Sequence, residues 1–112
     1  MNIDYENVWM SIPLPSIVLN NDDIVVEVNP PGEGFLNASN KSLKNKSIWE
    51  IINIDVSLED SYKKVKKFNS SLFITDVKVG AKGREATPCN IQIAPVIGLD
   101  GSTIILIAPR EI

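Results

Sequence analysis

The stretch that decides the fold is Ile12–Ile52, which reads IPLPSIVLNNDDIVVEVNPPGEGFLNASNKSLKNKSIWEII. It contains two short apolar segments, 16–19 and 24–28, and four turn-forming residues, 20–23, lie between them. Two segments of this kind on either side of a polar turn are typical of a β-hairpin. We therefore expect the chain to begin its sheet here, with a pair of antiparallel strands.

Side-chain oxygens suited to capping mark the starts of several helices after the hairpin. Asn29, followed by two prolines, predicts one short helix, and Ser39 predicts another. Ser47 and Glu50 form a capping box, which predicts a helix of about two turns. Ser57 begins the longest predicted helix, in which acidic residues come first and lysines follow, as the helix dipole favours.

The last third of the chain predicts three strands joined by tight turns. Segments 72–79, 89–93 and 103–108 are rich in apolar and β-branched residues, and glycine-containing turns separate them. The final strand is apolar on both faces, which favours a central position in the sheet. The whole order predicts an α+β fold: a five-stranded antiparallel sheet with short helices inserted between its second and third strands.

Side-chain alternation predicts which residues share a face of each strand, because neighbouring side chains point to opposite faces. In the second strand, one face should carry Ile24, Val26 and Val28. In the third strand, one face should carry Phe73, Thr75, Val77 and Val79. Cys89 should face inward from the fourth strand, so we interpret it as a structural residue and not as a reactive thiol.

The residues before the hairpin predict a flanking helix over 2–12, capped by Asn2 or Asp4. Apolar side chains recur on one face at helical spacing, namely Tyr5, Val8, Trp9 and Ile12. We therefore divide the chain into an N-terminal flanking helix within 1–13 and a globular domain over 14–112.

Composition narrows the classes of function. The chain has 112 residues and a mass of 12.3 kDa, enough for one domain. A formal net charge of -3 argues against a nucleic-acid surface, and the absence of histidine removes the commonest metal ligand and general base. The acidic start does not suit a signal peptide, and no apolar run approaches the roughly 20 residues that cross a bilayer. We expect a cytoplasmic, non-enzymatic protein without a metal, nucleic-acid or membrane partner.

The order of these elements resembles that of a PAS domain over nearly the whole chain. Asn29 stands at the Asn-Pro step that often follows the second strand of the family, and Asn45 stands where the family often has a left-handed glycine. Within the family, three segments resemble the N-terminal sensor domain of nitrogen-regulation histidine kinases: Val8–Pro15, Ile93–Pro95 and Ile107–Arg110.

This resemblance implies a domain that senses a signal, forms a homodimer and regulates phosphotransfer to a response regulator. The implied partners are the downstream kinase core of the same chain and a regulatory protein of nitrogen signalling. Because the sequence contains no kinase core, we expect it to be a fragment of a longer protein. No cofactor is expected: haem-binding PAS domains mostly use a histidine ligand, and flavin photosensors carry an Asn-Cys-Arg-Phe-Leu-Gln stretch, and this chain has neither.

The resemblance also places a set of inward side chains around the space in which PAS domains bind ligands. Two interpretations stay open. The side chains fill the core, which their size favours, or they surround a small apolar or weakly polar metabolite that Tyr62 orients. The pocket candidates are Val18, Val26, Val28, Phe35, Leu36, Ile48, Ile51, Tyr62, Val65, Phe73, Ile91 and Ile105.

A second set combines the flanking helix with the outer face of the sheet. An apolar surface of this extent favours a dimer interface, and the alternative is a monomer whose own helix covers its own sheet. The interface candidates are Tyr5, Val8, Trp9, Ile12, Ile17, Leu19, Val25, Ile104 and Leu106.

Overall fold

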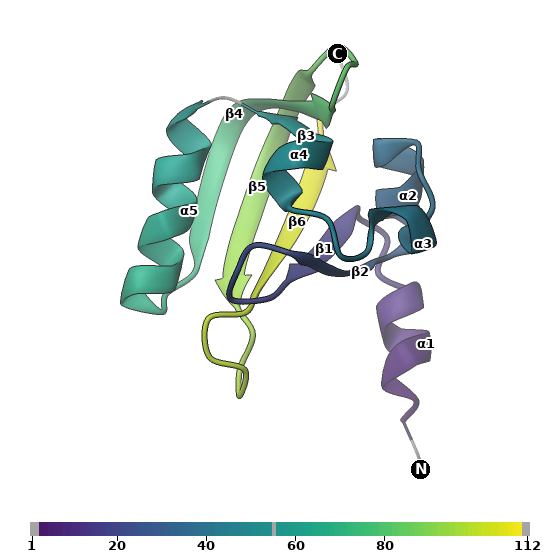
Figure 1. The fold of residues 1–112 in the computed structure, drawn as a ribbon, viewed down its shortest axis with the longest axis vertical. Coiled ribbons are helices and arrows are strands. Elements are labelled where there is room, and N and C mark those ends of the chain that lie inside the picture. Colours follow the sequence, from purple (N-terminus) through teal and green to yellow (C-terminus); the bar gives the residue numbers. More distant parts are fainter. Residues whose placement is uncertain (1–2, 55, 111–112) are drawn as a thin grey trace.

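A computed structural model describes residues 3–54 and 56–110, which form an antiparallel sheet with helices on one face (Figure 1). The strands are β1 (Ser16–Leu19), β2 (Val25–Val28), β3 (Ile52–Ile54), β4 (Leu72–Ala81), β5 (Thr87–Pro95) and β6 (Thr103–Pro109). The helices are α1 (Tyr5–Met10), α2 (Pro30–Leu36), α3 (Asn40–Leu43), α4 (Ile48–Ile51) and α5 (Val56–Phe68). The strand order is β2-β1-β6-β5-β4-β3, so β6 is central, as its apolar character predicted.

The described part of the sheet has six strands, one more than the sequence predicts. The additional strand, β3, pairs with the end of β4, where Ile52 lies opposite Ala81 and Ile54 lies opposite Val79. Isoleucines at 48, 51 and 52 match helical spacing, which is why they predict a two-turn helix. The backbone is already extended at Ile52, so α4 is a single turn.

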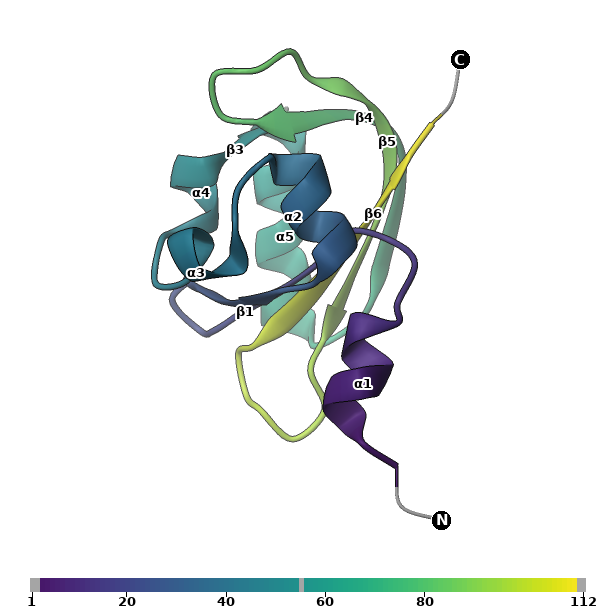
Figure 2. The ribbon, with the colours of Figure 1, turned by 90° about the vertical axis from the view of Figure 1, so that its right-hand side faces the viewer.

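The helices divide into two groups. Helices α2 to α5 lie together on the inner face of the sheet, and α1 projects away from them (Figure 2). Asp4, one of the two predicted caps, is confirmed: its side chain accepts a hydrogen bond from the Glu6 N–H at 3.0 Å. Helix α1 covers Tyr5–Met10 and is shorter than the predicted 2–12; Asn2, the other candidate cap, lies outside the described residues. No residue of α1 is fully buried. The core therefore forms between the sheet and the other four described helices.

The predicted faces of the first hairpin are wrong in β1 and partly wrong in β2, where Val28 is buried as predicted. In β1, Ile17 and Leu19 are fully buried and were expected on the outer face, whereas Val18 was expected inside and is only half-buried. A four-residue strand that is almost wholly apolar carries no alternation from which to choose a face. Pairing with β6 determines which face each side chain of β1 takes: Val18 lies opposite Ile104, on the outer side of β6.

A β-bulge causes the error in β2. Val18 pairs with Glu27 and Leu19 pairs with Val25, which leaves Val26 as the extra residue. Val26, predicted inside, is exposed, and Val25, predicted on the outer face, is buried. The alternation rule fails here because the bulge inserts a residue into only one strand.

A second bulge lies in β4. Ile74 pairs with Ile91 and Val77 with Cys89, and Asp76 between them adopts a left-handed backbone with φ 58°. The alternation changes face at this point. Val77 is buried as predicted, but Phe73, predicted on the same face, is exposed.

The side chain of Asn29 ties the start of the sheet to α2. Its Oδ1 accepts hydrogen bonds from the N–H groups of Ser16 and Gly32, each at 2.9 Å. Its Nδ2 donates to the carbonyls of Leu14 at 2.9 Å and Ile12 at 3.3 Å. The predicted helix cap is confirmed, and this fully buried amide has all its polar atoms partnered.

The Asn29→Ala variant should therefore lose about 3 kcal/mol or more of unfolding free energy, because it removes a cap and leaves the buried N–H of Ser16 unpaired. Urea denaturation measures this loss. Ser47→Ala is the matched control. Ser47 Oγ accepts one hydrogen bond, from the Trp49 N–H at 3.3 Å, so this variant should lose about 1 kcal/mol of unfolding free energy. Equal costs for the two variants would contradict the role of Asn29.

Candidate functional site

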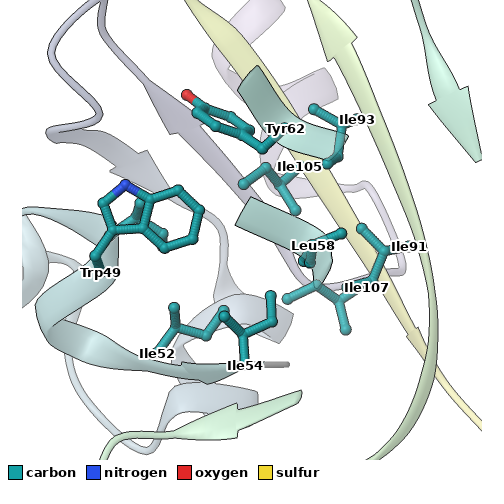
Figure 3. A pocket seen from close by; sticks show the side chains of 10 residues that line it. Trp49, Ile52, Ile54, Leu58, Tyr62, Ile91, Ile93, Ile105 and Ile107 are labelled. Carbon is teal, nitrogen blue, oxygen red and sulfur yellow. The ribbon is translucent and has the colours of Figure 1, made fainter. Parts of the chain in front are cut away.

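A small apolar cavity lies between the sheet and helices α4 and α5 (Figure 3). Its free volume is about 10 Å³, close to the space of one water molecule. Branched and aromatic side chains surround it: Ile48, Trp49, Ile52, Ile54, Leu58, Tyr62, Ile91, Ile93, Ile105 and Ile107. In the structure as described, these side chains almost fill the space between sheet and helices.

The structure brings four of the twelve pocket candidates to this cavity: Ile48, Tyr62, Ile91 and Ile105. Others are buried or half-buried elsewhere: Val18, Val28, Phe35, Leu36, Ile51 and Val65. Val26 and Phe73 are exposed because of the two bulges. Six lining residues were not predicted: Trp49, Ile52, Ile54, Leu58, Ile93 and Ile107. Strand alternation could have predicted Ile93 and Ile107, because each lies two residues along its strand from a pocket candidate.

The carboxylate of Asp23 forms a polar rim beside the cavity. Its Oδ2 accepts a hydrogen bond from Trp49 Nε1–H at 3.0 Å. Its Oδ1 accepts from the Tyr62 hydroxyl at 2.9 Å and from Lys66 Nζ at 3.0 Å, the latter as an ion pair. One carboxylate thus receives three donors from two helices.

Tyr62 connects this carboxylate to the sheet. The phenol is fully buried, and its oxygen lies 3.0 Å from Thr103 Oγ1 in β6. Its ring meets the indole of Trp49 edge-on, with centroids 5.5 Å apart and an interplanar angle of 78°. The two aromatic rings and Asp23 therefore form one contact network, with Tyr62 at its centre.

Local turn chemistry positions Asp23. Asn20 Oδ1 accepts from the N–H groups of Asp22 and Ile24, and Asp23 adopts a left-handed backbone with φ 62°, which aspartate tolerates. The carbonyl of Asp23 accepts from the Ile48 N–H at 2.9 Å, at the start of α4. The hairpin turn thus holds α4 through both its backbone and its side chain.

The network also shifts two pKa values. Burial raises the pKa of Asp23, but the three hydrogen bonds and the charge of Lys66 outweigh it, so the pKa lies below its ordinary 3.8. Burial, followed by the hydrogen bond and charge of Asp23, raises the pKa of Tyr62 above 10.0, against the opposing effect of Thr103. At neutral pH the site therefore pairs an ionised carboxylate with a protonated phenol.

Cys89 has the surroundings of a structural cysteine. Cys89 is fully buried, burial raises the pKa of its thiol, and its Sγ lies 3.3 Å from the Thr87 carbonyl. In residues 3–54 and 56–110, no cluster of three or more acidic, cysteine or histidine side chains is arranged to hold a metal ion. None of the helices in the same residues has the length and apolarity needed to cross a membrane.

The outer face of the sheet carries a strip of apolar side chains. Cross-strand partners share a face. Val18 lies opposite Ile104, and Phe73 lies opposite Gln92, which in turn lies opposite Leu106. Val18, Ile104 and Leu106 are half-buried and Phe73 is 57% exposed. This strip, which we call the outer strip, lacks the predicted Ile17, Leu19 and Val25, since these point into the core.

The charge of Asp23 makes stability depend on pH. A carboxylate whose pKa is lowered by folding contributes stability above its unfolded pKa and loses it as the pH falls through the folded value. Wild type should therefore be more stable than Asp23→Asn at about pH 7, and the gap should narrow below pH 3.8. Urea denaturation at several pH values measures the gap. A gap that is the same at about pH 7 and about pH 3 would contradict the assigned network.

Comparisons with known proteins agree on one fold. No protein-family model matches the chain. Over 105 residues the chain is 39% identical to the sensory histidine kinase/phosphatase NtrB of Rhodobacter capsulatus, a match that covers 94% of this chain and 30% of that protein.

Two solved structures share the architecture. The PAS domain of nitrogen regulation protein NR(II) from Vibrio parahaemolyticus has a TM-score of 0.77 at 13% identity, covering 97% of this chain and all of that one. A PAS domain in complex with ethanol, from a LuxR-family transcriptional regulator of Burkholderia thailandensis, has a TM-score of 0.73 at 11% identity, covering 96% and 97%. The chain therefore has the PAS fold, and its sequence is similar to part of the nitrogen-regulation histidine kinase/phosphatase NtrB.

Proposed function

We propose that this chain is the signal-sensing and dimerisation domain of a cytoplasmic nitrogen-regulation histidine kinase. The observation that carries the proposal is the 39% identity to NtrB across 94% of the chain. In this role the domain performs no chemistry itself. It biases the arrangement of a downstream kinase core, which transfers phosphate to a response regulator.

The outer strip supports the dimerisation part of the proposal. It joins the exposed Phe73 to three half-buried apolar side chains on one sheet face, and apolar patches that reach the surface are typical of an interface. Helix α1 adds more apolar side chains, with Tyr5 78% and Val8 52% exposed, while Trp9 and Ile12 are half-buried. Because α1 projects from the body of the domain, its exposed side chains are free to pack on a second copy, and a two-fold arrangement would pair the same surfaces (Figure 2).

The wild-type chain should sediment at about twice 12.3 kDa at micromolar concentration. Phe73→Glu should shift it toward the monomer, because a charge in the outer strip must lose its hydration on association. Val26→Glu is the matched control: Val26 is also an exposed apolar strand residue, but it is the bulge residue of the edge strand β2. A wild type that stays at 12.3 kDa would refute the dimer.

The kinase part of the proposal is tested with a hybrid protein. The segment of the Rhodobacter capsulatus NtrB that aligns with this chain is replaced by the 112 residues. The hybrid should still transfer phosphate from ATP to its response regulator, and Phe73→Glu in the hybrid should change that rate. A hybrid whose transfer rate is the same with the domain intact, substituted or deleted would contradict a regulatory role.

A metabolite receptor is the second candidate function. The apolar cavity with a carboxylate at its rim supports it, since ligand sites combine apolar walls with a few placed polar groups. A protein of the same fold, at 11% identity, is described in complex with ethanol. Native mass spectrometry of the purified chain distinguishes the two candidates, because a retained extra mass favours the receptor.

A further inference from the structure

Trp49 and Ile54 are the two half-buried residues of the cavity wall, and Trp49 is the larger of them. Residue Trp49 is half-buried, whereas the isoleucines of β5 and β6 that line the cavity are fully or almost fully buried. Figure 3 shows the ring at the edge of the cavity, on α4, across from the sheet residues. An outward rotation of this side chain would therefore open the cavity without disturbing the sheet.

Few contacts hold the backbone that carries this ring. Helix α4 has four residues, too few for a stable helix of its own. Its described backbone attachments to other segments are Ile48 N–H to the Asp23 carbonyl and Lys82 N–H to the Ile51 carbonyl, each 2.9 Å. The indole itself is held by its hydrogen bond to Asp23 and its edge contact with Tyr62. Between the pairing of Ser47 with Ile24 and that of Ile52 with Ala81, the ring is therefore held by one hydrogen bond and one edge contact.

The space that the ring occupies has a defined chemistry. This space has the planar shape of the indole and is bordered by Tyr62 and the apolar cavity. At one edge of it, an Asp23 oxygen accepts a hydrogen bond from the ring N–H. An ionised carboxylate accepts hydrogen bonds but donates none. A molecule that takes this place must therefore be planar and largely apolar, with one N–H or O–H donor at its edge and no negative charge.

We propose that Trp49 is a displaceable lid, and that the site beneath it binds planar, apolar molecules with one hydrogen-bond donor, which Asp23 recognises in place of the indole N–H. The inference deepens the receptor role proposed above and rests on it. Asp23 is the specificity-determining residue, since Tyr62 and Lys66 occupy its other oxygen. Ligand entry would break the Asp23–Trp49 bond while the Asp23–Tyr62–Thr103 connection to β6 persists.

Indole is the probe, because it copies the side chain that it replaces. The Trp49→Ala variant should bind indole and gain melting temperature from it, as apolar cavities of roughly benzene size bind small aromatic molecules. It should bind indole at least about tenfold more tightly than 1-methylindole, which has no donor for the charged Asp23. Equal affinity for the two molecules would overturn the assignment of Asp23.

Two variants serve as controls. In Trp49→Ala combined with Asp23→Asn, the preference for indole over 1-methylindole should shrink, because the charge that strengthens the bond is gone. Trp9→Ala removes the chain's other tryptophan, whose buried Nε1–H has no hydrogen-bond partner among the described residues. Because the site at Trp49 and Asp23 is intact in that variant, its preference for indole over 1-methylindole should equal that of wild type. A larger preference in Trp9→Ala would mean that another site recognises the donor, and would overturn its recognition by Asp23.

The wild-type chain tests displacement directly and does not depend on the folding of a variant. Adding indole should shift the Trp49 Nε1–H resonance in a saturable way and leave that of Trp9 unchanged. A Trp49 signal that is constant up to the solubility limit of indole would overturn the lid. That result would leave the dimer mass and the hybrid-kinase rate unaffected, so failure of this inference is distinguishable from failure of the sensor role.

Discussion

The carboxylate of Asp23 is the group on which the candidate site depends. It lies in the turn between β1 and β2, receives the indole N–H of α4, and receives the phenol and the ammonium of α5. Through Tyr62 it also reaches Thr103 of the central strand. Removing Asp23 would take an acceptor from three donors at once, although Lys66 would keep the Asn21 carbonyl and Tyr62 would keep Thr103. A molecule that displaces Trp49 would therefore bind the same carboxylate that Tyr62 connects to β6.

The central strand, β6, contributes apolar side chains to both faces of the sheet. Ile105 and Ile107 of β6 line the cavity, while Ile104 and Leu106 belong to the outer strip. Close packing transmits small displacements, because interiors have few voids and low compressibility. In the proposed sensor, this alternation places the ligand side and the dimer side on neighbouring residues of one strand, with no intervening element.

The sequence predicts local chemistry better than it predicts faces and long-range contacts. Helix caps such as Asn29 were predictable because a cap depends on a few neighbouring residues. The positions of Val26 and Phe73 were not, because a bulge depends on pairing with another strand. Tyr62 stood out as the one polar group near the pocket, but its partner Asp23 lies 39 residues away, a separation that no periodicity reveals.

The most direct test of the Asp23 network is the pH dependence of the two indole N–H resonances. Proton NMR of the wild-type chain from about pH 6 down to about pH 2 should show the Trp49 Nε1–H signal titrating with a midpoint below 3.8, as its acceptor becomes protonated. The Trp9 signal should not follow that transition, since its N–H has no partner among the described residues. A Trp49 resonance that does not titrate, or that titrates above 3.8, would contradict the central role of Asp23.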